Sequence, residues 1–174
     1  MTTNDEQSGA SDPARALKTL MLAEPRWTLA VAESLTAGHL QARVASVSGA
    51  SNYFLGGLTA YSLEEKVRLL GVDRVLAEAT DCVAREVAEQ MARGVCALFG
   101  ANVGVATTGY AEPAVDKGVP VPFAWWAVAV RKSESFFARS GRVEVSGAAR
   151  VEVQRRVAEA VLGEIAKVVR EGRQ

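Results

Sequence analysis

The sequence contains little histidine and cysteine, and neither residue is arranged as a metal or disulfide site would require. A single histidine, His39, excludes a histidine-rich metal centre. The two cysteines, Cys82 and Cys96, lie too far apart for a paired metal motif and show no pattern of a disulfide framework. We expect His39 to be a surface or packing residue, because a lone histidine usually is.

The sequence also lacks an excess of charge and a long apolar run. Lysine and arginine total 20, as do aspartate and glutamate, so no strong electrostatic field favours nucleic acid or an acidic membrane surface. Hydrophobic residues make up 49% of the chain, but no run reaches membrane-spanning length and no signal peptide is recognisable at the start. We therefore expect a soluble cytoplasmic protein with no nucleic-acid or membrane partner.

The length and the order of the apolar segments predict the fold. The chain has 174 residues, enough for one domain with its own core. Residues 1–11 are small and polar, which predicts a disordered tail, and residues 12–174 remain as the domain. Short apolar segments alternate with amphipathic ones, and two strand-like segments form a late hairpin. This order predicts an α/β fold, a three-layer α/β/α sandwich with a mixed sheet.

The individual elements follow from periodicity and from start and stop signals. Strands are expected over residues 27–32, 55–61, 103–107, 123–130 and 136–145. Helices are expected from Pro13 to Glu24 and over residues 37–47, 64–70, 73–79 and 148–170. A longer helix ending at Gly100 is expected to bury Val83, Val87, Met91, Val95 and Leu98. Residues 108–122 form the longest irregular stretch, and long loops at strand ends commonly carry function.

The most informative segment leads from the first strand into a helix. Residues 27–32 are apolar, and Ser34, Thr36 and Gly38 then turn the chain. A strand that turns into a helix at small residues leaves free backbone N–H groups at a positive helix terminus. Ser34 would then lie beside a surface that can hold negative charge. The alternative is that Ser34 only caps the helix.

Four short motifs extend this segment. They are VAESLTAG at residues 31–38, SGASNYF at 48–54, GGLTAYSLEEK at 56–66 and LLGV at 69–72. In their order and spacing the chain resembles the CinA C-terminal domain family, the nicotinamide mononucleotide deamidases. The likeness continues more weakly to about residue 156. Four motifs in the same order are a far more specific signal than any one of them.

The resemblance implies a Ser-Lys mechanism. Hydrolysis of a carboxamide requires a nucleophile, a base and donors for the oxyanion, and a single histidine argues against a Ser-His-Asp triad. In the family the corresponding serine and lysine act as nucleophile and base with a tyrosine beside them, which implies Ser34, Lys66 and Tyr61. Lys66 can serve as a base only if it is neutral, so its pKa must be lowered. The implied protein needs no cofactor and no metal, binds a small nucleotide, and forms a homo-oligomer.

The resemblance also implies substrate-binding positions. Backbone groups around Thr36, Ala37 and Gly38 are candidates for the oxyanion hole or the substrate phosphate, and Ser48, Thr108, Gly109 and Arg150 are further candidates. Several departures from the family pattern affect this part of the chain. Ala37 replaces a glycine, and residues 107–115 lose the family's glycines and gain Glu112. Arg150 lies one position later than the arginine of the family's GDR-like motif near the last helix. Arg155 or Arg156 is therefore an alternative phosphate ligand.

Two other readings remain open from the sequence. The chain could be a non-catalytic member that keeps the fold and self-association but binds another ligand or none, as the altered loop favours. It could also be an amidase for a different amide, with the same serine and lysine behind a reshaped pocket.

Overall fold

The computed structural model describes residues 12–133 and 135–174, so the tail expected over residues 1–11 lies outside the described residues. The helices are α1 (Pro13–Leu22), α2 (His39–Ala45), α3 (Leu63–Leu70), α4 (Arg74–Ala79), α5 (Arg85–Phe99) and α6 (Arg150–Gly172), with short 3₁₀ helices η1 (Ala50–Asn52) and η2 (Val115–Lys117). The strands are β1 (Leu29–Glu33), β2 (Phe54–Thr59), β3 (Val103–Tyr110), β4 (Phe123–Arg131) and β5 (Phe136–Glu144). Among these residues, no helix combines the length and the apolar composition that crossing a membrane would require.

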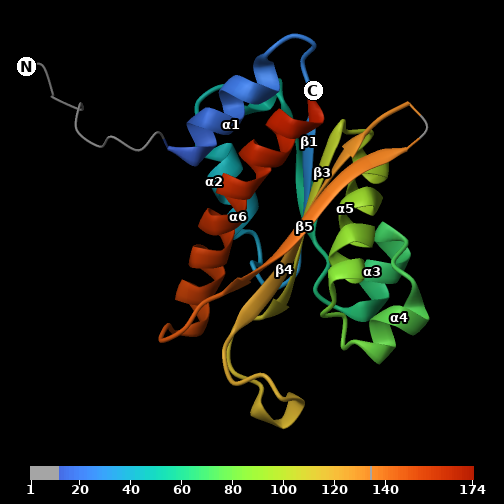
Figure 1. The fold of residues 1–174 in the computed structure, drawn as a ribbon, viewed down its shortest axis with the longest axis vertical. Coiled ribbons are helices and arrows are strands. Elements are labelled where there is room, and N and C mark those ends of the chain that lie inside the picture. Colours follow the sequence, from blue (N-terminus) through green and yellow to red (C-terminus); the bar gives the residue numbers. More distant parts are fainter. Residues whose placement is uncertain (1–11, 134) are drawn as a thin grey trace, which may run out of the picture.

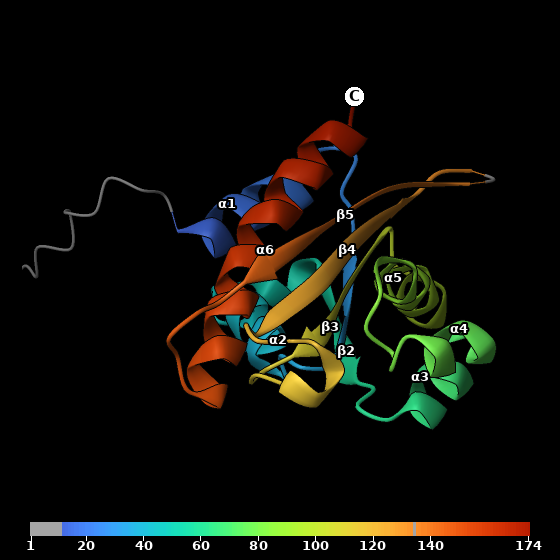
Figure 2. The same cartoon turned by 60° about the horizontal axis from the view of Figure 1, so that its bottom comes forward.

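The strands form one mixed sheet between two helical layers (Figure 1). Their order is β2-β1-β3-β4-β5. Strand β1 runs parallel to β2 and β3, whereas β4 is antiparallel to both β3 and β5. Helices α1, α2 and α6 cover one face and α3, α4 and α5 the other, as both views show (Figures 1 and 2). The expected three-layer α/β/α sandwich is confirmed.

The two faces of the sheet bury side chains of different size. Valine and leucine side chains face α1 and α6, whereas the face under α5 is lined mostly by alanine. Gly104 on β3 lies so close to α5 that an added Cβ would be 2.0 Å from the backbone oxygen of Ala92. Small residues therefore let α5 pack tightly on the sheet, which also holds in place the turn that precedes α5.

Strand β3 and helix α5 differ from the expectation. Residues 108–110 continue β3 because they pair in antiparallel register with residues 123–125 of β4, so the irregular loop spans residues 111–122. On α5, Leu98 is exposed. The buried stripe instead includes Ala88, Ala92 and Cys96, whose small side chains fit the alanine-lined sheet. Val83 precedes α5 rather than lying within it.

The path of the chain favours a ligand-binding crevice at the carboxyl ends of the parallel strands. From β1 the chain crosses to β2 through α2 on one face, and from β2 it returns to β3 through α3, α4 and α5 on the other. The connections therefore leave the carboxyl ends of the adjacent parallel strands β1 and β2 toward opposite faces. In open α/β sheets, ligands bind outside the carboxyl ends of strands at such a switch point.

Candidate active site

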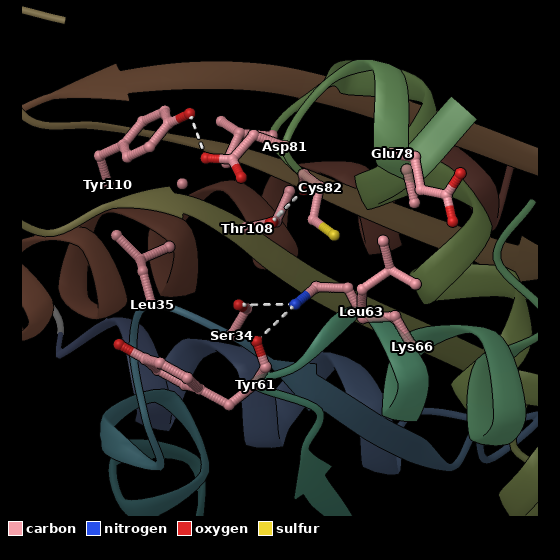
Figure 3. A pocket seen from close by; sticks show the side chains of 13 residues that line it. Ser34, Leu35, Tyr61, Leu63, Lys66, Glu78, Asp81, Cys82, Thr108 and Tyr110 are labelled. Carbon is pink, nitrogen blue, oxygen red and sulfur yellow. Dashed lines mark hydrogen bonds between the residues drawn. The ribbon is translucent and has the colours of Figure 1, made fainter. Parts of the chain in front are cut away.

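The ends of β1 and β2 bring Ser34 and Lys66 together. Ser34 directly follows β1, and its backbone N–H donates to the carbonyl of Thr107 on β3 at 3.0 Å. The N–H of Ala60, just after β2, donates to the carbonyl of Glu33 at 2.9 Å, which places the start of α3 beside β1. Lys66 on α3 then extends its Nζ to 3.0 Å from Ser34 Oγ (Figure 3). The two side chains that the resemblance implies as nucleophile and base thus lie within hydrogen-bond distance of each other.

The Lys66 side chain is enclosed, with 1% of its surface exposed. Besides Ser34 Oγ, its Nζ contacts the backbone carbonyls of Ala60 at 2.9 Å and Tyr61 at 3.1 Å. A neutral amine has two N–H groups and one lone pair. If the two carbonyls accept the two N–H groups, the lone pair faces the Ser34 hydroxyl, which is the orientation a general base needs.

Burial also favours the neutral form of Lys66. Removal from water penalises the ammonium and lowers the pKa of Lys66, while Cys82 and Asp81 act in the opposite direction. Both opposing groups are weakened. Burial raises the pKa of the Cys82 thiol, so the thiol remains neutral near pH 7, and the Asp81 side chain is 53% exposed, so water screens its charge. The site therefore provides the lowered lysine pKa that a Ser-Lys mechanism requires.

Ser34 does not cap α2. The N-cap of α2 is Gly38, and no side chain at that position bonds the helix. The buried carboxylate of Glu33 instead accepts from the N–H groups of Gly38 at 2.9 Å, Leu40 at 3.1 Å and Gln41 at 2.8 Å. Glu33 thus satisfies the helix terminus, which leaves the Ser34 hydroxyl to Lys66. The capping interpretation of Ser34 is wrong.

The same contacts correct the expected anion site at residues 36–38. The N–H of Ala37 donates to the carbonyl of Ser34 at 3.1 Å, and the N–H of Gly38 is bound to Glu33. Both residues adopt positive φ, 49° and 100°, in the turn. The N–H groups of Leu35 and Thr36, at the centre of the turn, have no hydrogen-bond partner among the described residues. These two donors, rather than Ala37 and Gly38, are the free ones beside Ser34.

The side chain of Thr36 is buried away from the pocket. Its Oγ1 lies 2.7 Å from Oγ1 of Thr107, which ties the turn after β1 to β3. Ser48 is also outside the site. Its carbonyl accepts from Nζ of Lys18 on α1 at 2.8 Å, and it lines a separate hollow near that helix. The structure therefore places Ser48 apart from Ser34 and Lys66, because the chain after α2 turns toward α1.

Ser34 and Lys66 open into a pocket of about 460 Å³, which we call the inner pocket. Its walls come from the turn after β1, the start of α3, the end of α4 with the turn that follows, and the end of β3. The lining residues are Ser34, Leu35, Tyr61, Leu63, Lys66, Ala77, Glu78, Asp81, Cys82, Val83, Thr108, Gly109 and Tyr110. Thr108 and Gly109, expected from the sequence, are among them. Thr108 Oγ1 donates to the carbonyl of Cys82 at 2.7 Å and so joins β3 to the turn before α5 (Figure 3).

A second hollow of about 270 Å³, the outer pocket, adjoins the inner pocket. The two share Leu35, Tyr61, Gly109 and Tyr110, and the outer pocket adds residues 111–114, Asp116, Lys117 and Arg150. The guanidinium of Arg150 donates to Glu112 at 2.8 Å and to the Tyr61 hydroxyl at 2.5 Å. The Tyr61 hydroxyl thus contacts Arg150, while the contact between Tyr61 and Lys66 is made by its backbone carbonyl.

The alternative arginines lie elsewhere. Arg155 and Arg156 both bind Glu152, at 2.6 Å and 2.8 Å. Together with His39 they line a different hollow between α2 and α6. Of the three arginines considered for phosphate, only Arg150 lines the outer pocket. His39 lines neither the inner nor the outer pocket.

The turn between α4 and α5 contributes residues that the sequence did not single out. Asp81 and Cys82 have positive φ values of 52° and 61°, an uncommon conformation for residues other than glycine. Asp81 accepts a hydrogen bond from the Tyr110 hydroxyl at 2.9 Å and is paired with Lys117. No glycine marks this turn in the sequence, so its left-handed conformation could not be expected from residue type.

Comparisons with known proteins agree along most of the chain. Residues 12–169 match the model of the CinA C-terminal domain. A CinA-like protein of Chlorobium limicola is 43% identical over 146 residues, which cover 83% of this chain and 34% of that protein. The chain thus spans about a third of the length of the first curated relatives it matches.

Solved structures show the same fold. The competence-damaged protein (CinA) superfamily protein from Enterobacter cloacae superposes with a TM-score of 0.83 at 22% identity, covering 97% of this chain and 99% of that one. The competence damage-inducible protein A (ComA) from Klebsiella pneumoniae gives a TM-score of 0.81 at 24% identity, covering 89% and 93%. At these identities the likeness establishes the fold alone.

Proposed function

Because the chain belongs to the family of CinA C-terminal domains, we propose that it is an amidohydrolase that converts nicotinamide mononucleotide to nicotinate mononucleotide and ammonia. The observation that carries the proposal is the buried Lys66 amine, 3.0 Å from Ser34 Oγ at the wall of a pocket. Lys66 is enclosed beside a serine hydroxyl, and no carboxylate among residues 12–133 and 135–174 is bonded to its Nζ, so it is suited to act as a base.

The first half of the reaction forms an ester on the enzyme. Neutral Lys66 takes the proton of the Ser34 hydroxyl as Oγ attacks the carboxamide carbon. The tetrahedral intermediate then collapses, and the Lys66 ammonium returns its proton to the departing nitrogen, which leaves as ammonia. Ser34 now carries the nicotinoyl group, and Lys66 is neutral again.

The second half hydrolyses this ester. A water molecule attacks the ester carbon while Lys66 accepts one of its protons. Collapse of the second tetrahedral intermediate breaks the bond to Ser34 Oγ, which takes the proton back from Lys66. Nicotinate mononucleotide leaves, and both residues return to their starting states.

Each tetrahedral intermediate places negative charge on the former carbonyl oxygen. The free N–H group of Leu35, which directly follows Ser34 and lines the inner pocket, is the donor that supports this part of the proposal. Backbone donors held in a folded turn stabilise such an oxyanion without having to reorganise during the reaction. Glu33 contributes indirectly, because it satisfies the terminus of α2 and so holds the turn.

The substrate phosphate is expected in the outer pocket, where Arg150 lies. A guanidinium binds phosphate through two parallel hydrogen bonds. Arg150 is partly engaged by Glu112 and by Tyr61, so the Glu112 carboxylate competes with phosphate for the guanidinium.

An ammonia-release assay on nicotinamide mononucleotide with the wild-type protein tests the proposal. We expect ammonia and nicotinate mononucleotide in equal amounts, with no added metal. A protein that releases no ammonia while binding the mononucleotide would instead be a non-catalytic ligand-binding member of the family.

A second candidate function is an amidase for an amide without a phosphate. It is favoured by the outer pocket, where Arg150 is already paired with Glu112 and Lys117 with Asp81. The same assay with nicotinamide riboside separates the two candidates. A higher kcat/KM for the riboside than for the mononucleotide would favour the second.

A further inference from the structure

The outer pocket contains a second cation, Lys117, at the end of η2. Its ammonium is paired with Asp81 on the turn between α4 and α5 and lies 5.7 Å from the centre of the Tyr110 ring. The Tyr110 hydroxyl also binds Asp81, at 2.9 Å. These three residues connect the loop of residues 111–122 to the far wall of the inner pocket.

Lys117 is placed where the far end of a long substrate would lie. The inner and outer pockets meet at Leu35, Tyr61, Gly109 and Tyr110. A ligand that puts its carboxamide beside Ser34 and passes this junction enters the outer pocket. Among the described residues, Lys117 and Arg150 are the cations that line this pocket.

The ion pair between Lys117 and Asp81 is open to exchange. The two side chains are 46% and 53% exposed, so water screens the pair and its loss costs little. A phosphate carries more negative charge than a carboxylate and offers three acceptor oxygens. When Lys117 turns away, Asp81 keeps its hydrogen bond from Tyr110.

Resting on the proposed function, we infer that Lys117 leaves Asp81 to bind the phosphate of the nucleotide and so selects the mononucleotide over the nucleoside. The carboxylate of Asp81 holds the lysine near the junction until the phosphate arrives. Arg150 and Lys117 then contact the phosphate from two different elements, α6 and the loop of residues 111–122.

The rival explanation is that the Asp81–Lys117 pair only holds the loop in shape. Two substitutions break the pair from opposite sides. Lys117→Met removes the cation, whereas Asp81→Asn leaves Lys117 free. Asparagine tolerates the positive φ at residue 81 and can still accept from Tyr110. If the pair only holds the loop in shape, both substitutions should weaken mononucleotide binding equally. If Lys117 binds the phosphate, only Lys117→Met should weaken it.

The test is calorimetric binding of nicotinamide mononucleotide and nicotinamide riboside to variants built on Ser34→Ala, which removes turnover. We expect Lys117→Met to weaken mononucleotide binding at least about tenfold and to reduce the preference over the riboside by a similar factor. Asp81→Asn should leave mononucleotide binding as tight or tighter. The matched control is Lys167→Met, which removes a lysine paired with Glu164 on α6, outside both pockets.

Three results would overturn the inference. They are equal weakening by Lys117→Met and Asp81→Asn, equal weakening of both ligands by Lys117→Met, and no mononucleotide binding in the Ser34→Ala parent. Ammonia release is measured separately with Ser34 intact. Tight mononucleotide binding without turnover would contradict the proposed hydrolysis while leaving the assignment of Lys117 supported.

Discussion

The inner and outer pockets are built from opposite kinds of interaction. In the inner pocket, Lys66 is 1% exposed and is held by a hydroxyl and two backbone carbonyls. In the outer pocket, Arg150 and Lys117 are paired with carboxylates, and all four side chains are at least 43% exposed. The inner contacts are therefore strong and fixed, whereas the outer ones are screened by water and exchangeable.

This difference suits the inner pocket to the proposed chemistry and the outer pocket to recognition of a charged group. The proposed chemistry at Ser34 requires one geometry, which buried hydrogen bonds from strand ends can hold. Recognition of a substrate's charged end requires groups that can change partners at low cost. The sequence shows the same contrast. The motifs around Ser34 and Lys66 follow the family pattern, whereas residues 107–115, several of which line the outer pocket, depart from it.

The largest effect is expected from breaking the inner pair. Ser34→Ala removes the proposed nucleophile and should lower kcat by several orders of magnitude, since the proposed covalent route disappears. Lys66→Met should do nearly the same, and the double variant should be little worse than either single one, because residues that act as a unit are strongly non-additive. Ammonia release on all three variants measures this.

Stability provides the control for these variants. Glu33, not Ser34, satisfies the terminus of α2. Ser34→Ala should therefore change the free energy of unfolding by no more than about 1 kcal/mol, the usual net value of one hydrogen bond. A large loss of melting temperature with activity retained would contradict the catalytic assignment.

The second prediction concerns pH. Burial lowers the pKa of Lys66 below its ordinary value of 10.5, and only the neutral amine is a base. Activity should fall about tenfold per pH unit below the lowered pKa and reach its plateau before pH 10.5. A pH–rate profile of kcat/KM measures this, and a plateau reached only above 10.5 would contradict a buried neutral base.

The free energy of unfolding should also depend on pH through Lys66. Between the lowered pKa and 10.5, the unfolded chain binds more protons at Lys66 than the folded protein does. The contribution of Lys66 to stability therefore rises with pH through this window and is least favourable below it. Lys66→Met should remove this component. The unfolding free energy of the wild type minus that of the variant should therefore rise with pH through this window.

A smaller effect is expected at Glu33, which supports the inner pocket from behind. Glu33→Gln removes a buried charge that accepts three backbone N–H bonds and turns an amide NH₂ toward donors. We expect a loss of about 2 kcal/mol in unfolding free energy and roughly a tenfold loss of activity as the Ser34 turn loosens. Glu159→Gln is the control: this carboxylate, 47% exposed, pairs with Arg43, so its loss should cost less than about 1 kcal/mol.

Much of the inner pocket could be predicted from the sequence because its signals are local. An apolar strand ends at Ser34, and Ser62 with Glu65 begins the helix that carries Lys66. In the structure Ser62 accepts from the N–H of Glu65 at 3.3 Å. Parallel neighbouring strands then bring the two segments together. The role of Glu33 was missed, because a glutamate at the end of a strand does not reveal which helix terminus it faces.

The outer pocket could not be predicted in the same way, because its contacts are tertiary. Asp81 and Lys117 lie 36 residues apart and meet through a turn with positive φ at Asp81 and Cys82, where no glycine marks the conformation. Similarly, residues 108–110 join β3 only because β4 pairs with them. Ser48 belongs to a shared motif, yet the chain path carries it to the α1 side.

The smallest effect is expected at Glu112, where one exposed carboxylate holds Arg150 at 2.8 Å. Glu112→Gly should lower KM for nicotinamide mononucleotide, because it frees the guanidinium and removes a negative charge near the phosphate. The two side chains are 62% and 43% exposed, so we expect no more than about a fivefold change, shrinking as salt is added. Glu112→Gln removes the charge without adding backbone freedom and should give the same direction. An unchanged KM at low ionic strength in both variants would mean that the phosphate does not reach Arg150, and the contrast between a fixed inner pocket and an exchangeable outer one would then not describe substrate binding.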